Sequence, residues 1–238
     1  SPSDEPCDAP LIDLTQPFYG STACTYTPST GSPSGCGSIE NDSYMKFIAS
    51  DDTVEIEYTV QAADANCTDG VQFFLFEENT SCSDLVAIPG TCVNAFSTPN
   101  VGTTDSWVLF GLNIGDEYYI RTDGSAGDLC DYNFEPITGV ATTPPNGECA
   151  DATVLACGES DTASIILATD TDKPTGCSGL TTGKGNWYII SGTGVDITLS
   201  TDNAETNFGT EINVYSGICG SLTCVASDDD SGTTLSNA

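Results

Sequence analysis

The sequence predicts an all-β protein made of tandem antiparallel β-sandwich domains, jelly-roll-like in type and stapled by disulfides, with the second domain incomplete. Three observations lead to this prediction. Glycine and proline are frequent, with 24 and 12 residues, and Leu-rich helical stretches are missing. Short segments alternate apolar and polar residues. Twelve cysteines occur in 238 residues.

The alternation is clearest in two segments, each with one apolar face, which is the pattern of a half-buried antiparallel strand. The apolar positions are Val54, Ile56, Tyr58 and Val60 in the first segment and Val195, Ile197 and Leu199 in the second. Turn residues separate these segments from further expected strands, which favours a sandwich. Those strands are expected at 71–76, 106–112, 117–122, 132–137, 163–169, 186–190 and 211–215. No helix longer than one turn is expected.

The two halves of the chain are copies of one unit. SDEPCDAPLIDL (3–14) matches NGECADATVLAC (146–157), and GVQFFLF (70–76) matches GTEINVY (209–215). Between these blocks, Tyr44 and Trp187 occupy matching positions 143 residues apart. Matched blocks in the same order indicate an internal repeat. The expected domains are residues 1–140 and 147–238, joined by a stiff Pro-rich linker at 141–146.

The second copy has no counterpart of residues 105–138, a block that carries three expected strands. A sandwich without them would expose core residues and unpaired strand edges. We expect the sequence to be a piece of a longer gene product, as its start at Ser1 also suggests. The alternative is that a neighbouring chain supplies the missing strands.

Charge and composition argue against several classes of function. The chain has 35 acidic and 4 basic residues, for a formal net charge of −31, so nucleic acid and anionic membranes are not expected partners. No apolar run predicts membrane insertion. The chain has no histidine, which removes the Ser-His-Asp and Cys-His catalytic arrangements. Asp230-Ser231-Gly232 lacks the second aspartate of an aspartic protease. We therefore predict no enzyme.

The cysteines predict disulfides and an extracellular, oxidising location, because no CxxC pair and no histidine favour metal binding. Cysteines that flank short loops predict four pairs, each stabilising the fold by about 2–4 kcal/mol. These pairs are Cys24–Cys36, Cys82–Cys92, Cys157–Cys177 and Cys219–Cys224. A fifth pair, Cys7–Cys130, would join the first strand to the last. Cys149 then has no partner, and Cys67 is unassigned.

One acidic run is a candidate metal site. Asp228-Asp229-Asp230 offers carboxylate oxygens to calcium, the only cofactor expected, although the run lacks the alternating aspartates of a standard calcium loop. A solvated acidic turn is the alternative interpretation. Further aspartates of the same type are Asp51, Asp52, Asp123, Asp128, Asp170 and Asp172.

The motifs as a whole resemble a known module. The pattern DEPCDAPLIDL...SYMKF...VQFFLFEENTSC...GLNIGDEYYIRTDG, with ECADATVLACG, NWYIISGTGVDITLST and VYSGICGSLTCVASDDD in the second copy, resembles the pre-peptidase C-terminal-like β-sandwich repeats. Such repeats occur in large secreted and cell-surface proteins of Bacteroidota. The resemblance covers nearly the whole chain. The first copy departs from the pattern, with PGTCVN (89–94) in place of SDDDSG (227–232).

The resemblance implies export by the type 9 secretion system and a role in an adhesin or appendage. It also makes Thr53 and Thr162 candidates for O-glycosylation, since each lies in an Asp-Thr-aliphatic motif. We expect structural or adhesive repeat modules of a long exported cell-surface or filament-forming protein. The partners would be neighbouring repeats of the same chain, assembled as a homo-oligomer or filament, and the surface receptor or glycan stays open. The alternative is a non-catalytic accessory module of a secreted hydrolase or protease, which binds carbohydrate or assists folding.

Overall fold

A computed structural model describes the chain over most of its length and divides it into unit 1, Ser1–Thr142, and unit 2, Thr143–Ala238. The residues described are 2–13, 16–23, 36–37, 39–63, 65–95, 99–170, 172, 174, 177, 183–203, 206 and 208–229. Within them the chain is all-β, and its helical elements are three short 3₁₀ turns. None of these helices is long and apolar enough to cross a membrane.

The connection between the units is shorter than the predicted linker at 141–146. The backbone N–H of Ala141 donates to the carbonyl of Ile48 at 2.8 Å, and therefore belongs to unit 1. The carbonyl of Asn146 accepts from the backbone N–H of Trp187 at 2.7 Å, and therefore belongs to unit 2. Only residues 142–145 lie between these two anchored positions.

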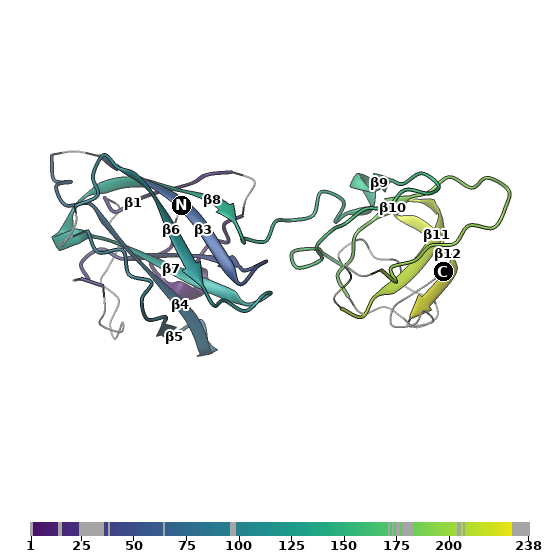
Figure 1. Ribbon diagram of the computed structural model, residues 1–238, viewed down its shortest axis with the longest axis horizontal. Coiled ribbons are helices and arrows are strands. Elements are labelled where there is room, and N and C mark those ends of the chain that lie inside the picture. Colours follow the sequence, from purple (N-terminus) through teal and green to yellow (C-terminus); the bar gives the residue numbers. More distant parts are fainter. Residues whose placement is uncertain are drawn as a thin grey trace. The chain divides into compact units, whose positions relative to one another are not determined.

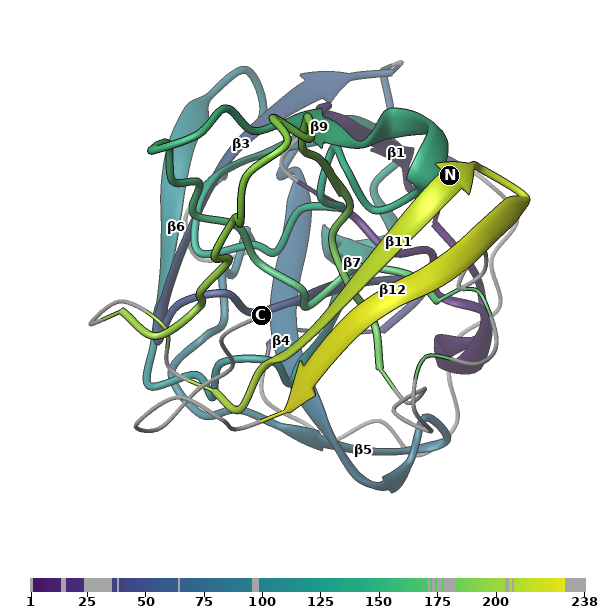
Figure 2. The same cartoon turned by 90° about the vertical axis from the view of Figure 1, so that its right-hand side faces the viewer.

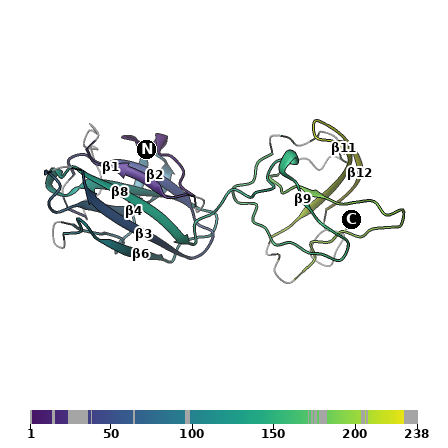
Figure 3. The ribbon, with the colours of Figure 1, turned by 90° about the horizontal axis from the view of Figure 1, so that it is seen from above.

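Unit 1 is a sandwich of two four-stranded antiparallel sheets (Figure 1), with strand orders β1-β8-β3-β6 and β2-β7-β4-β5. Figure 3 shows its strands from above, including β1, β8, β3 and β6 of the first sheet. The strands are β1 Phe18–Ser21, β2 Ser43–Ile48, β3 Thr53–Ala62, β4 Val71–Ser81, β5 Asp84–Ala87, β6 Thr104–Phe110, β7 Glu117–Gly124 and β8 Cys130–Thr138. Two 3₁₀ turns, η1 Pro6–Asp8 and η2 Ser125–Gly127, complete the unit. The strands predicted at 71–76, 106–112, 117–122 and 132–137 are confirmed.

The core of unit 1 lies between the two sheets and follows the predicted alternation. In β3, every second residue from Val54 to Val60 is buried and the residues between them are half-buried. Phe73 of β4 lies at the centre of an aromatic group, with its ring centroid 4.9 Å from that of Tyr58 and 4.8 Å from that of Phe134. Both pairs are edge-to-face, a favoured geometry for aromatic rings.

The outer face of the β2-β7-β4-β5 sheet is covered as well. The N-terminal segment lies along β2, through an antiparallel bridge from Ser3 to Tyr44 and a parallel bridge from Leu11 to Lys46. This covering explains why 71–76 is apolar at every position except Gln72, because β4 is buried on both faces over that length. The buried apolar residues that pack together on this face are Ala9, Cys36, Tyr44, Phe74, Phe76 and Tyr119.

The described part of unit 2 contains two small sheets. β9 Thr153–Val154 pairs in parallel with β10 Tyr188–Ile189, after a 3₁₀ turn, η3, at Cys149–Asp151. β11 Glu211–Ile218 and β12 Ser221–Asp229 form an antiparallel hairpin (Figure 2). The strand predicted at 211–215 is confirmed, and the one at 186–190 is reduced to two residues. The segments 163–169 and 195–199 are not strands.

Backbone hydrogen bonds confirm the internal repeat, because they recur at positions 143 residues apart. In unit 1 the N–H of Ile12 donates to the carbonyl of Lys46, and in unit 2 the N–H of Leu155 donates to that of Ile189. The bond from Tyr44 N–H to the carbonyl of Ser3 likewise has a counterpart between Trp187 and Asn146. The turns η1 and η3 match in the same way.

The disulfides join cysteines in combinations different from those predicted. The bonds are Cys7–Cys82, Cys36–Cys92, Cys67–Cys130, Cys149–Cys219 and Cys177–Cys224. Cys157 has an exposed free thiol. The predicted pairs Cys24–Cys36, Cys82–Cys92, Cys157–Cys177, Cys219–Cys224 and Cys7–Cys130 are therefore all wrong, and Cys24 itself lies outside the described residues.

The physical reason is that the prediction paired cysteines across short loops, whereas the fold brings together segments distant in sequence. The bonded cysteines are 47 to 75 residues apart. Two bonds are equivalent in the two units: Cys7–Cys82 matches Cys149–Cys219, and Cys36–Cys92 matches Cys177–Cys224. In unit 1 these two disulfides join the chain before β2 to the region of the β4–β5 hairpin. In unit 2 they join the chain before β10 to the β11–β12 hairpin.

Candidate functional site

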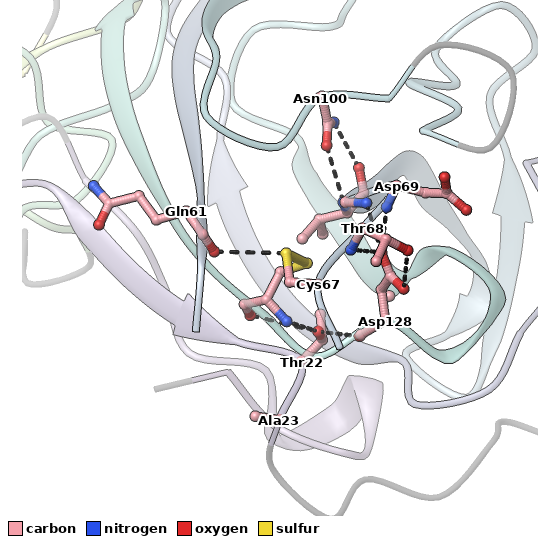
Figure 4. Close-up of a disulfide and its surroundings, with 12 residues drawn as sticks. Thr22, Ala23, Gln61, Cys67, Thr68, Asp69, Asn100 and Asp128 are labelled. Carbon is pink, nitrogen blue, oxygen red and sulfur yellow. Dashed lines mark hydrogen bonds between the residues drawn. A yellow bond between two sulfur atoms is a disulfide. The ribbon is translucent and has the colours of Figure 1, made fainter. Parts of the chain in front are cut away.

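The strongest concentration of buried polar groups beside a cystine lies at one end of unit 1 (Figure 4). Cys67, in the loop between β3 and β4, bonds to Cys130 at the start of β8. Asp128, in the loop between β7 and β8, is buried beside them. Its Oδ2 accepts hydrogen bonds from the backbone N–H groups of Thr68, Asp69 and Gly70, at 2.7, 2.6 and 2.9 Å.

These three consecutive N–H groups form a small anion-binding nest, which the carboxylate of Asp128 fills from within the protein. The hydroxyl of Thr68 donates to the other carboxylate oxygen at 3.2 Å. Gly70 has a φ of +118°, a conformation that favours glycine and that turns the chain into β4. Asn100 then holds the first residue of β4, accepting from the N–H of Val71 and donating to its carbonyl.

The same point also fixes the end of β1. The backbone N–H of Thr22 donates to the carbonyl of Cys130, and the N–H of Cys130 donates to the hydroxyl oxygen of Thr22 at 2.9 Å. That hydroxyl donates to the carbonyl of Asp128 at 2.7 Å. A covalent bond and a network of buried hydrogen bonds therefore tie three loops together.

Cys67, Asp128 and Cys130 each place one potential metal-ligand atom within 4.8 Å of the others. The chemistry of these atoms does not suit a metal. Both sulfurs are consumed in a disulfide, so neither is a thiolate, which is the form that binds metals. The carboxylate oxygens of Asp128 already accept from four donors. The arrangement is a structural fastening of the loops, and Asp128, one of the predicted calcium aspartates, serves as an internal cap.

A second buried polar group lies on the outer face of β4 and β7. Gln72 and Asp123 are cross-strand neighbours, and Arg121 lies two residues before Asp123 on the same face. All three are at most 3% exposed. Both amide atoms of Gln72, Nη1 of Arg121 and Oδ2 of Asp123 are buried and lack hydrogen-bond partners among the described residues. The guanidinium of Arg121 lies over the ring of Phe76, 5.2 Å from its centroid.

Asp123 combines burial with partial hydrogen bonding. Its Oδ1 accepts from the backbone N–H groups of Asn41 and Glu40, at 2.9 and 3.3 Å. Desolvation raises the pKa of this carboxyl to about 6, because burial disfavours the charged form more than the two N–H groups favour it. The neighbouring carboxylates of Glu40 and Asp42 act in the same direction as burial. The raised pKa places the charge change of Asp123 at about pH 6.

An acidic depression lies between the second half of β4 and the start of β7, lined by Glu77, Glu78, Asp116, Glu117 and Tyr118. The hydroxyl of Tyr119 lies 2.6 Å from Oε1 of Glu78 and 2.5 Å from Oε1 of Glu117. Lys46 forms an ion pair with Glu117 at 3.0 Å. Burial, followed by the hydrogen bonds to the two glutamates, raises the pKa of Tyr119. Both glutamates are therefore engaged with neighbouring side chains rather than held free as an acid and a base.

The two described aspartates of the predicted calcium run lie on opposite faces of one strand. Asp228 and Asp229 are consecutive residues of β12, opposite Ile212 and Glu211 of β11. Consecutive side chains of a strand point to opposite faces, so these two carboxylates diverge. Asp230 lies outside the described residues. Calcium binding at this run stays an untested prediction with an unfavourable geometry.

The other predicted positions serve different purposes. Asp172 accepts from the indole N–H of Trp187 at 3.0 Å and from the backbone N–H of Cys149, so it caps the turn η3. Thr53 begins β3 and is half-buried, with its hydroxyl donating to Asp52 at 3.0 Å. Thr162 is exposed. Glycosylation of the two threonines stays a prediction.

Sequence reasoning named Asp128 and Asp123 only as candidate calcium ligands, did not predict their hydrogen bonds to backbone N–H groups, and missed Gln72 and Arg121. The signal available for Asp128 was its position two residues before Cys130. The signal for Gln72 was a polar residue inside the apolar run 71–76, and Arg121 directly follows the apolar run 118–120. Comparisons of the chain with protein-family models, with curated proteins and with solved structures found no match.

Proposed function

We propose that the chain provides structural repeat modules of a longer exported cell-surface or filament-forming protein, acting by mechanical support rather than by catalysis. The observation that carries the proposal is that the two units share a disulfide framework. The bonds Cys7–Cys82 and Cys149–Cys219 fasten equivalent N-terminal segments to equivalent hairpins. A feature kept in both copies of a repeat serves what the two copies have in common.

The polar groups of unit 1 support the same proposal. The carboxylate of Asp128 is consumed by backbone N–H groups, and the glutamates of the acidic depression are held by Tyr119 and Lys46. The position of Glu78 in the β4–β5 hairpin is taken in unit 2 by Gly217, since Glu78 pairs with Leu85 and Gly217 with Leu222. The hairpin is therefore present in unit 2 without a counterpart of the Glu78 carboxylate. The two units share the hairpin and its disulfides, and they do not share the acidic depression.

The surroundings implied by the covalent chemistry agree with this role. Five disulfides in the described residues are typical of an oxidising compartment, such as the cell exterior. The net charge of −31 favours solubility and keeps neighbouring copies of the module from non-specific association.

The test is immunogold electron microscopy of intact cells, with antibodies raised against the 238-residue chain. We expect label along fibres or over a surface layer, with several labels along one structure. Loss of these structures on mild reduction and protease treatment, but not on protease treatment alone, would support the role of the disulfides. Soluble monomers that carry a separate catalytic domain would contradict the proposal and favour an accessory module of a secreted hydrolase.

A further inference from the structure

Unpartnered buried polar atoms are concentrated at one place in unit 1. Among the described residues of the unit, the buried side-chain atoms that lack a hydrogen-bond partner belong to Gln72 in β4, Arg121 and Asp123 in β7, and Ser125 at the start of η2. All four residues are at most 3% exposed. Buried polar atoms are nearly always paired in proteins, so this concentration indicates a site that binds a polar ligand.

Three of these residues bring oxygen atoms to one end of the β4–β7 pair. Gln72 and Asp123 are direct cross-strand neighbours, and side chains in that relation have Cβ atoms about 5 Å apart. The backbone N–H of Ser125 donates to the carbonyl of Gly70 at 2.9 Å, which places Ser125 beside the start of β4. The unpartnered oxygens are Oε1 of Gln72, Oδ2 of Asp123 and Oγ of Ser125.

The guanidinium of Arg121 is directed away from these oxygens. Arg121 lies opposite Phe74, two residues along β4 from Gln72, and its guanidinium lies over the ring of Phe76, two residues further still. An aromatic face is a suitable contact for a guanidinium. Arg121 forms no ion pair with a carboxylate in the described part of the chain. The carboxylate of Asp123 therefore has no positive side chain as its partner there.

The segment before β2 adds negative charge at the same place. The backbone N–H groups of Asn41 and Glu40 donate to Oδ1 of Asp123, and the fully buried Asp42 accepts from the hydroxyl of Tyr44 at 3.1 Å. Burial is the main cause of the raised pKa of Asp123, and the charges of Glu40 and Asp42 raise it further. Two buried carboxylates and the exposed carboxylate of Glu40 therefore lie close enough to repel one another.

The frame that the two units share does not require these acids. In the register that relates the units, 143 residues apart, Gly183 and Gly185 occupy the positions of Glu40 and Asp42. The segment that follows pairs with the N-terminal segment in both units all the same. Mutual repulsion of buried carboxylates destabilises unit 1, and a bound cation would offset this repulsion.

We propose that unit 1 binds a calcium ion between the segment before β2 and the adjoining ends of β4 and β7. The ligands are the oxygens of Gln72, Asp123 and Ser125, together with the carboxylates of Asp42 and Glu40. Calcium takes about six to eight oxygen ligands, which include carboxylates, side-chain amides and water. The exposed side chain of Glu40 gives the ion a route from solvent.

The donor set favours calcium over other cations. Three carboxylates suit a divalent ion better than a monovalent one, because more negative charge is neutralised. The ligands come from separate elements of the fold, and calcium accepts irregular geometry whereas magnesium requires a near-ideal octahedron. The ion would join these elements and so stabilise unit 1. The proposal does not rest on the structural role proposed above.

The test titrates calcium chloride into the full 238-residue chain by calorimetry, at pH 7.5 and constant ionic strength, after a chelator has been added and dialysed away. We expect saturable binding with a dissociation constant of about 10⁻⁴ to 10⁻³ M, the range of extracellular calcium modules. The Tm should rise with the calcium concentration. Magnesium should bind at least tenfold more weakly.

Matched variants locate the ion. Asp123→Asn removes a buried carboxylate and should weaken calcium binding at least tenfold. Asp131→Asn removes the same charge at an exposed position of β8 and should change the affinity by less than twofold. Asp228→Asn makes the same change in the predicted acidic run and should also change the affinity by less than twofold.

A further variant keeps the charge of the site. Gln72→Leu removes the amide oxygen, leaves every carboxylate in place, and should weaken binding at least threefold. Each rise in Tm is measured against the same variant without calcium, so a change in intrinsic stability cancels. Circular dichroism and intact disulfides establish that the variants are folded.

Four results would overturn the proposal. One is no saturable binding at tens of millimolar calcium. Another is binding that Asp123→Asn and Asp131→Asn weaken equally, which would reduce the effect to net charge. A third is binding that is lost in Asp228→Asn and kept in Asp123→Asn, which would place the ion at the acidic run. The last is equal affinity for magnesium, which would contradict the choice of calcium.

Discussion

Asp123 makes the stability of unit 1 depend on pH in a direction opposite to that of most carboxylates. Its pKa is raised by burial from an ordinary 3.8 to about 6 in the folded protein. A raised folded-state pKa means that the protonated carboxyl stabilises the fold. This contribution is fully present below about pH 4 and is lost as the pH rises through 6. A difference of about two pKa units corresponds to about 3 kcal/mol, which is the upper limit of the pH-dependent contribution of Asp123 to the free energy of unfolding.

Asp123→Asn removes the charge and keeps an oxygen that can accept from the N–H groups of Asn41 and Glu40. We compare the free energy of unfolding of the variant with that of the parent at each pH. We expect this difference to shift in favour of the variant by about 1–3 kcal/mol between pH 4 and pH 7. Any cost of the buried amide is the same at both pH values and cancels from this difference.

The assay is urea denaturation of unit 1 at pH 4, 5, 6 and 7, followed by Trp107 fluorescence in a background that carries Trp187→Phe. Asp105→Asn, on the exposed side of β6, is the matched control and should show no such pH dependence. A relative stability of Asp123→Asn that is equal at pH 4 and pH 7 would refute the reasoning, because it would mean that Asp123 ionises normally in the folded protein.

Three further predictions concern the stability of unit 1, and urea denaturation measures each of them. Asp128→Ala leaves three N–H groups without their acceptor and should destabilise the unit by about 3–5 kcal/mol, with Asp128→Asn losing less because it keeps an acceptor oxygen; equal losses would show that the retained acceptor contributes nothing. Replacing Cys36 and Cys92 together by serine should cost about 2–4 kcal/mol, and an unchanged stability would mean that the bond adds nothing to the fold. Phe73→Ala should cost about 3–5 kcal/mol. Its control Phe110→Ala, at a residue 71% exposed, should cost less than about 0.5 kcal/mol, and similar losses from both would contradict the assigned core.

The fold class and the repeat were predictable because they depend on periodicity. The alternation of β3 is visible within one short segment, and the repeat is visible when the two halves of the chain are compared with each other. Both are confirmed in the structure. The same alternation at 195–199 misled the prediction, because a strand also needs partners to complete its hydrogen bonds. The composition of a segment carries no information on whether those partners are present.

The disulfides and the polar groups were not predictable in the same way. Cys82 lies ten residues from Cys92 along the chain, yet it bonds to Cys7, because the sandwich places the N-terminal segment on the outer face of a sheet. The role of Asp128 depends on the conformation of a loop sixty residues earlier, at Thr68. Contacts of this kind are decided by topology, which the spacing of residues does not express.

The disulfides of unit 1 also change how far the chain can be stretched. A force applied at the two ends of unit 1 does not travel along all 142 residues. The shortest covalent route runs from the start to Cys7, across to Cys82, back to Cys67, and across to Cys130. That route contains 36 residues, so a fully unravelled unit would reach about 120 Å rather than the about 480 Å of an uncrosslinked chain. Oxidation thus limits the maximum extension of the unit to about a quarter of its contour length, even after every hydrogen bond has broken.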